Sequence, residues 1–138
     1  MSRFVVDCSV TLAWCFENQA DDYTRGVLTR LDRDEALVPS VWPLEVANAL
    51  AVAERRKKLS RSTASRFVAA LGPLPILVQQ DTHLWALGPI LTLARELHLS
   101  AYDAAYLELA IREGLSLATR DEALKKAARA SRVELARG

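Results

Sequence analysis

Four acidic side chains of this sequence stand where a carboxylate could do chemistry. Asp7 ends a short apolar run, Glu45 begins an apolar helical stretch, Asp103 completes the segment SAYD, and Asp121 lies in the segment TRDE. Carboxylate oxygens select hard cations such as Mg²⁺ or Mn²⁺ over zinc. Such a cation can lower the pKa of a bound water, orient it in line with a phosphodiester and stabilise the leaving oxygen.

Each of these acids also has an ordinary structural explanation. Asp7 can cap a helix N-terminus, and Glu45 can stabilise the positive end of a helix dipole. The segments SAYD and TRDE both resemble capping boxes, which would put Asp121 in the first turn of the second helix. Taken singly, each acid is more typical of a cap or dipole residue than of a catalyst.

The helical phase of two acids favours the functional interpretation. Asp103 and Glu45 each continue an apolar helical stripe, made of Leu107, Ala110 and Ile111 for the first acid and of Ala49 and Val52 for the second. A carboxylate on a buried face is costly unless it is paired, protonated or bound to a cation. Neither acid has a Lys or Arg three or four residues further on. Carboxylates ~5 Å apart repel by roughly 3 kcal/mol, so a cluster needs raised pKa values or a metal.

Three polar residues and two basic clusters complete the candidate site. Ser9, Asn48 and Thr119 each lie two or three residues from an acid and could hydrogen-bond a ligand or a bound water, although they are equally typical of caps and helix packing. The chain has 18 Lys and Arg and 17 Asp and Glu. If four of the acids lie in a buried site, the remaining surface is modestly positive, and a polyanion could bind it. The candidate cations are Arg55, Arg56, Lys57, Lys58, Arg61 and Arg66, and Lys125, Lys126 and Arg129. Such runs are also typical of solvated helix ends.

The elements that must position these residues alternate between short strands and helices. Apolar runs predict strands at 4–6, 36–38, 76–79, 115–119 and 133–135, and helical periodicity predicts helices at 10–18, 20–35, 41–58, 60–71, 82–97, 101–113 and 122–130. The pair Gly88-Pro89 should interrupt the fifth helix. Helical crossovers imply a mostly parallel sheet in a three-layer α/β/α fold. A ligand crevice is then expected beyond the carboxyl ends of the strands.

Length and composition indicate one globular domain over residues 1–138. Hydrophobic residues make up 51% of the chain and charged ones 25%, which excludes disordered and low-complexity classes. Two cysteines provide neither a disulfide framework nor a zinc-site spacing. No signal peptide or membrane span is recognisable, so we expect a cytoplasmic protein. The aromatic residues Trp14, Trp42, Trp85, Tyr102 and Tyr106 are expected in the core, and His83 and His98 lack a catalytic or ligand pattern.

Four segments together resemble the PIN domain, with VapC-type toxins as the closest subgroup. They are FVVDCSV, LEVANAL, LSAYDAAYLELA and LATRDEALKKAA, and the resemblance spans the chain in order and length. It implies an Mg²⁺ or Mn²⁺ site made by Asp7, Glu45, Asp103 and Asp121, with Ser9 and Thr119 in support. The T-x-D pattern favours Asp121 over its neighbour Glu122. The resemblance further implies a metal-dependent endoribonuclease acting on RNA, a homodimer, and a small antitoxin that masks the site.

Two other classes of function are compatible with the residues. A phosphotransfer enzyme of the haloacid-dehalogenase kind would use Asp7 as a covalent nucleophile, but the acid expected two positions later is Ser9. A non-catalytic interaction module would use the acids only as helix caps and would bury a partner on its Ala-rich helices. Acid-to-amide substitution separates these readings, because Asn caps a helix nearly as well as Asp but is a poor ligand for a hard cation.

Overall fold

Four short parallel strands form the centre of the computed structural model, which describes residues 2–138. They are β1 (Arg3–Val6), β2 (Glu35–Pro39), β3 (Ile76–Gln79) and β4 (Leu117–Ala118), side by side in the order β3-β2-β1-β4. The three neighbouring pairs are all parallel. The strands therefore lie where the apolar runs predicted them, although β4 is shorter than its run.

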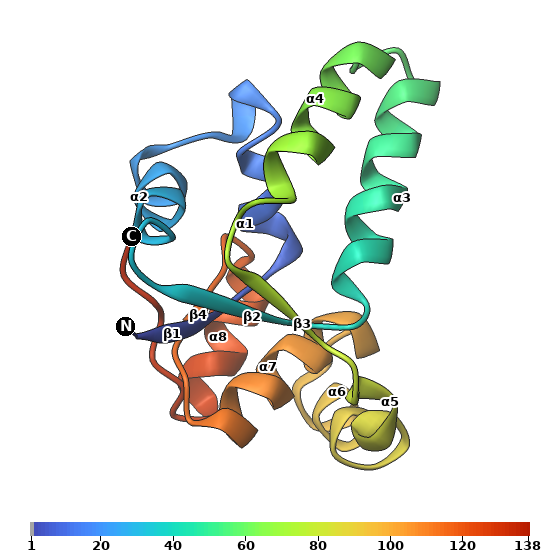
Figure 1. Ribbon diagram of the computed structural model, residues 1–138. Coiled ribbons are helices and arrows are strands. Elements are labelled where there is room, and N and C mark those ends of the chain that lie inside the picture. The colour runs from blue at the N-terminus through green and yellow to red at the C-terminus, as the bar shows by residue number, and fades with distance from the viewer. Residues whose placement is uncertain (1) are drawn as a thin grey trace.

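Helices connect the strands and cover both faces of the sheet, as Figure 1 shows. On one face lie α1 (Cys8–Ala13), the short 3₁₀ helix η1 (Glu17–Gln19), α2 (Asp22–Arg30), α3 (Trp42–Arg55) and α4 (Arg61–Leu71). On the other lie α5 (Thr82–Trp85), the π-helical turn η2 (Ala86–Ile90), α6 (Leu91–Leu97), α7 (Ala101–Glu113) and α8 (Glu122–Ala130). This is the predicted three-layer α/β/α arrangement.

Three helices are shorter or more broken than their patterns predict. The first ends at Ala13, where the Trp14 backbone N–H bonds to the Thr11 carbonyl instead of continuing the α-helical pattern. The second begins only at Asp22, because Asp21 and Thr24 form a capping box. The long stretch at 82–97 divides around a π-helical turn that contains Pro89, which has no backbone N–H to donate. The interruption at Gly88-Pro89 is thus confirmed.

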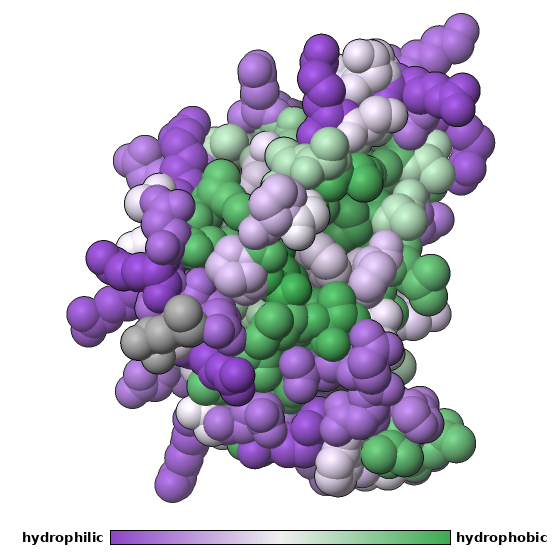
Figure 2. Space-filling view, viewed as in Figure 1, coloured by the Kyte–Doolittle hydropathy of each residue, from purple (hydrophilic) through white to green (hydrophobic). Residues whose placement is uncertain are grey.

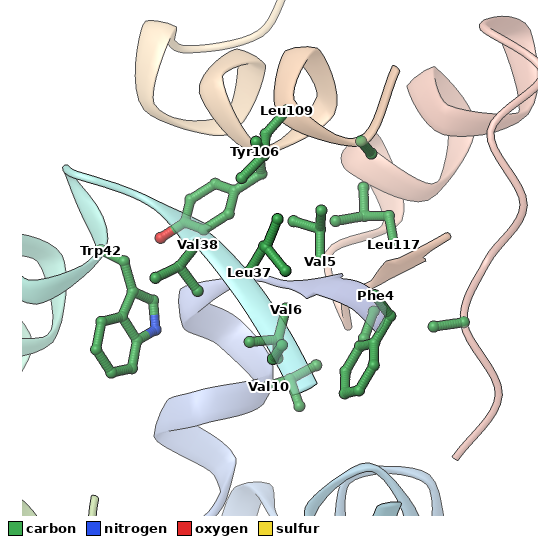
Figure 3. Packing of buried hydrophobic residues seen from close by; sticks show 14 of the residues in the cluster. Phe4, Val5, Val6, Val10, Leu37, Val38, Trp42, Tyr106, Leu109 and Leu117 are labelled. Carbon is green, nitrogen blue, oxygen red and sulfur yellow. The ribbon is translucent and has the colours of Figure 1, made fainter. Parts of the chain in front are cut away.

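The core lies on both faces of β1 and β2 and is filled mainly by branched aliphatic side chains. Phe4, Val6 and Tyr106 are fully buried in it, and Figure 3 shows Tyr106 reaching from α7 toward the start of α3 with its hydroxyl leading. The prediction that the aromatic residues are core is wrong for Tyr102, which is 60% exposed. Ile111 is 45% exposed, so the apolar stripe of Asp103 is buried only in part. Both residues lie outside the buried run 104–110 of α7.

The end of the chain returns to the sheet beside β4. A single parallel bridge joins Leu117 to Leu135, so the predicted last strand exists only as this contact. The Tyr23 hydroxyl donates to the Ala136 carbonyl at 2.9 Å, which ties the end of the chain to α2. A Cβ at Gly26 would stand 2.5 Å from the Gly138 carbonyl carbon, so this close approach requires glycine. Across residues 2–138, no helix is both long and apolar enough to cross a membrane.

Candidate functional site

Asp7 lies at the carboxyl end of β1 and at the start of α1. Its side chain accepts a hydrogen bond from the Val10 backbone N–H at 3.1 Å, so it caps α1 as the structural interpretation requires. The residue is only 3% exposed, however, and a simple cap does not need burial. The two interpretations are therefore compatible: the cap fixes the carboxylate in a buried position at the sheet edge.

Two hydroxyl groups also donate to the Asp7 carboxylate. Ser9 Oγ donates to Asp7 Oδ1 at 2.7 Å, and Thr119 Oγ1 donates to Asp7 Oδ2. The same hydroxyl oxygens accept backbone N–H bonds at 3.0 Å, Ser9 from Arg120 and Thr119 from Asp121. This network ties the loop after β1 to the loop after β4, which fixes Asp121 relative to Asp7.

Glu45 lies in the first turn of α3, outside the hydrogen-bond network around Asp7. Pro43 occupies an early position of that helix, where its missing N–H costs no hydrogen bond. Tyr106, on α7, donates its hydroxyl proton to Glu45 Oε1 at 2.7 Å. Burial raises the pKa of Tyr106, so this hydroxyl remains a donor at physiological pH. The bond fixes one oxygen of Glu45 and leaves the other free.

Asp103 and Asp121 both lie at helix N-termini. The Asp103 backbone N–H donates to Ser100 Oγ at 3.0 Å, which confirms Ser100 as the cap of α7. The capping-box prediction for TRDE is wrong, because Asp121 itself is the N-cap of α8 and accepts from Leu124 N–H at 2.9 Å. Thr119 is unavailable as a cap since its hydroxyl bonds Asp7. Glu122 is exposed and pairs with a lysine of its own helix.

The four acids influence one another electrostatically. Burial raises the pKa of Asp7 to about 6 against the hydrogen bonds that lower it, and the charge of Asp103 adds to the rise. Burial also raises the pKa of Glu45 and of Asp103, with further contributions from Asp103 on Glu45 and from Asp121 on Asp103. Within residues 2–138, none of the four carboxylates forms an ion pair with a Lys, Arg or His.

Cys8 and Asn48 border this cluster on its open side. Both residues line a hollow of about 470 Å³ together with Glu45 and Tyr102. Burial, followed by the charges of Glu45, Asp7 and Asp103, raises the pKa of Cys8 to about 12, so the thiol is not a nucleophile at neutral pH. Asn48 is exposed on α3. The prediction that Glu45 continues a buried helical face is wrong, since Ala49 of that face lines this hollow instead of the core.

Two functional contacts were not predicted from the sequence. One is the Tyr106–Glu45 hydrogen bond, and the other is a chain in which Trp42 Nε1 donates to Thr11 Oγ1 while Thr11 Oγ1 donates to the Asp7 carbonyl, both at 3.0 Å. Their only sequence signal is that Trp and Tyr carry a polar group that needs a partner when buried. The partners are too distant along the chain to be read from local spacing.

The chemistry of these donors fits a hard divalent cation. Between residues 2 and 138, no three His, Cys, Asp or Glu side chains are already arranged as a metal site. The cluster nevertheless offers carboxylate oxygens, which Mg²⁺ and Mn²⁺ prefer. It is also uncompensated: Asp7 is buried with a raised pKa and no cationic partner, and a bound cation would remove that penalty.

Comparison with known proteins shows the family to which the chain belongs. The model of the PIN domain matches residues 4–130. The chain belongs to the PIN domain family. PIN domains are typically nucleases and generally depend on a metal. No curated protein matches the chain in sequence.

Three solved structures share the fold of this PIN domain. PAE2754 from Pyrobaculum aerophilum has a TM-score of 0.65 and 24% identity, covering 92% of this chain and 87% of its own. VapBC2 from Rickettsia felis, bound to a DNA fragment from their promoter, has a TM-score of 0.67 and 17% identity, covering 99% and 98%. FitAcB from Neisseria gonorrhoeae has a TM-score of 0.62 and 17% identity, covering 98% and 96%.

Proposed function

We propose that this PIN domain is an Mg²⁺- or Mn²⁺-dependent endoribonuclease. The observation that supports this best is an acidic cluster centred on Asp7, whose carboxylate is buried at the carboxyl end of β1 with no cationic partner in the described chain; burial, together with the charge of a neighbouring acid, raises its pKa and those of Glu45 and Asp103. A structural cluster of that kind is destabilising on its own, since like charges and burial oppose folding. A bound cation offsets this cost, which gives the arrangement a reason to exist.

The proposal assigns the cation to Asp7, Glu45, Asp103 and Asp121. When bound, the ion supplies Lewis-acid chemistry for phosphodiester hydrolysis, lowering the pKa of water and stabilising negative charge on the phosphate.

The polar neighbours act as positioning residues. Ser9 and Thr119 donate to Asp7 and keep both of its oxygens oriented, and Tyr106 does the same for one oxygen of Glu45. Asn48 stands at the rim, where it can hydrogen-bond the substrate. The haloacid-dehalogenase alternative is disfavoured, because Ser9 is committed as a donor to Asp7 and no acid occupies its position.

We further propose that the protein is the toxin of a VapBC-type pair, with a small antitoxin as partner and a homodimer as its assembly. The four sequence segments that resemble VapC-type toxins support this, together with the likeness in fold to VapBC2 and FitAcB. Two exposed leucines, Leu44 at 72%, which lines the hollow beside Glu45, and Leu87 at 88%, in η2, provide apolar surface for such contacts.

Cleavage of RNA by the purified protein tests the nuclease proposal. Wild type, Asp103→Asn and the control Asp32→Asn are incubated with RNA in Mg²⁺, Mn²⁺ or EDTA. The control alters an exposed aspartate that forms no ion pair within residues 2–138. We expect metal-dependent cleavage by wild type and by the control, and none by folded Asp103→Asn. Equal activity in all three proteins, or cleavage that persists in EDTA, would contradict the proposal and favour a contaminant or an interaction module.

A further inference from the structure

A groove runs along α3 from the acidic cluster to the tip of the α3–α4 hairpin. The hollow of about 470 Å³ that contains Glu45 shares Leu12, Asn48 and Ala49 with a second hollow of about 710 Å³. Because three residues line both, the two hollows are continuous. The second hollow ends at Arg56 and Lys58. One groove therefore joins Glu45, one of the four acids, at one end to two cations at the other.

The cations at the far end have no partner within the described residues. Arg56 and Lys58 are exposed and form no ion pair there, and the same is true of their neighbours Arg55 and Lys57. Figure 2 shows hydrophilic side chains gathered over this hairpin tip. Four adjacent unpaired cations repel one another, and a polyanion lying against them would relieve that repulsion.

The groove between its charged ends has the lining of a single-stranded nucleic-acid site. Its amide side chains, Asn18, Gln19 and Asn48, can both donate to and accept from base edges and 2′-hydroxyls. Phe16, also in the lining, offers an aromatic surface for stacking. A neutral or basic peptide would not compensate these unpaired cations, whereas a strand with one phosphate per nucleotide would.

The length of the groove sets the length of strand that it can hold. Arg56 lies 11 residues after Glu45 on α3 and its C-cap. At 1.5 Å per residue, the two positions are about 16 Å apart along the helix axis. This span requires several nucleotides, within the roughly 4 to 16 that single-stranded sites cover.

We propose that this groove is the track of the RNA substrate, with Arg56 and Lys58 holding phosphates several nucleotides away from the bond to be cut. The inference rests on the proposed nuclease function, since it takes the acidic cluster as the point of cleavage. It makes these two cations positioning residues for substrate, distinct from the carboxylates that hold the metal. The other basic cluster, on α8, has no part in the track.

Equilibrium binding of a short RNA to the full-length protein tests the track without requiring catalysis. The probe is a fluorescein-labelled 12-nucleotide oligouridine, measured by anisotropy over a range of NaCl in EDTA, where nothing is cleaved and no divalent ion competes. The groove variant Arg56→Ala/Lys58→Ala is compared with the control Arg129→Ala/Lys126→Ala. The control removes one Arg and one Lys, both exposed and unpaired in the described chain, from α8.

Loss of two phosphate contacts from a single strand should lower the salt slope of log K by about 1.4, which is about 25-fold in affinity at 0.1 M salt. The control should keep the wild-type slope and lie within about threefold of its affinity. Equal losses of RNA affinity in both variants, or a groove variant that binds RNA as wild type does, would overturn the inference. In the second case, a protein segment becomes the alternative occupant of the groove.

The outcome of this binding test is separate from that of the cleavage test. If the groove variant binds RNA normally but wild type still cleaves in a metal-dependent way, the track is wrong and the nuclease proposal stands. If RNA binding follows the prediction but no protein cleaves, the nuclease proposal fails instead. Thermal melts of both double variants check that neither result comes from unfolding.

Discussion

Replacing the buried carboxylate at position 7 should stabilise the metal-free protein, and by an amount that depends on pH. Burial raises the pKa of Asp7 in the folded protein to about 6, from the value of 3.8 that a solvent-exposed aspartate has. Asp7 thus binds its proton more tightly in the folded state. Its contribution to stability is fully present below pH 4 and is lost as the pH rises through 6. A shift of this size corresponds to about 3 kcal/mol.

The substitution Asp7→Asn removes this titration. It keeps an oxygen that accepts from the Val10 N–H and the Ser9 hydroxyl, and it places an amide NH₂ that can donate to the Thr119 hydroxyl. Urea unfolding of wild type and variant is measured in EDTA between pH 4.5 and 7.5. We expect the stability of the variant relative to wild type to rise by about 2 kcal/mol over this range. Constant offsets from altered hydrogen bonds cancel in that difference.

Titrations that wild type and variant share cancel in this difference, and what remains is the titration of Asp7 with its coupling to Asp103. Hydrogen bonds from Arg30 and Ser2 hold the pKa of Asp34 at about 2, so its stabilisation is lost only as the pH falls below 4. That loss is also common to both proteins. A stability difference that stays flat from pH 4.5 to 7.5, or that turns against the variant as the pH rises, would refute the argument that Asp7 is an uncompensated buried charge.

Three further results are expected. Mn²⁺ at about 100 times its Kd should stabilise wild type by about 2.7 kcal/mol in thermal or urea unfolding. The variant Asp103→Asn should lose most of this stabilisation and the control Asp32→Asn should keep it. No stabilisation of wild type by Mn²⁺ would contradict the metal site. Tyr106→Phe should cost about 1 kcal/mol in unfolding and lower RNA cleavage, since it removes the only side-chain hydrogen bond that Glu45 accepts within residues 2–138. Full activity would show that this bond does not position the carboxylate. Arg112→Ala should lower the free energy of unfolding by about 3 kcal/mol, because it leaves the buried carboxylate of Glu108 without the guanidinium that donates to it at 2.9 and 3.3 Å. A free energy of unfolding within error of wild type would show that this ion pair is dispensable.

The sequence predicts the sheet and the edge that carries the acids because these depend on short-range patterns. Apolar β-rich runs followed directly by Asp7, and by Thr119 and Asp121, are enough to place the carboxyl ends of β1 and β4. In a parallel sheet these ends share one edge. Which acids contribute to a metal site stays a prediction until metal binding is measured.

The details that orient the acids depend on contacts that no local pattern contains. Thr119 was predicted to cap α8, but its hydroxyl bonds Asp7, which lies 112 residues earlier. Tyr106 was expected only as core, yet its hydroxyl reaches Glu45 at the edge of that core. The groove along α3 was also unforeseen, because the periodicity that marks Ala49 as a sheltered position does not distinguish a groove from a core.

The location of bound Mn²⁺ tests the central claim most directly. Crystals of the wild-type protein grown with Mn²⁺ are measured near the manganese absorption edge, so that the anomalous signal identifies the ion. The account predicts Mn²⁺ between Asp7, Glu45, Asp103 and Asp121, with carboxylate oxygens at roughly 2.0 to 2.2 Å, as for hard divalent ions. Mn²⁺ bound only elsewhere in the protein, or no anomalous signal at the acidic cluster in crystals saturated with Mn²⁺, would contradict it.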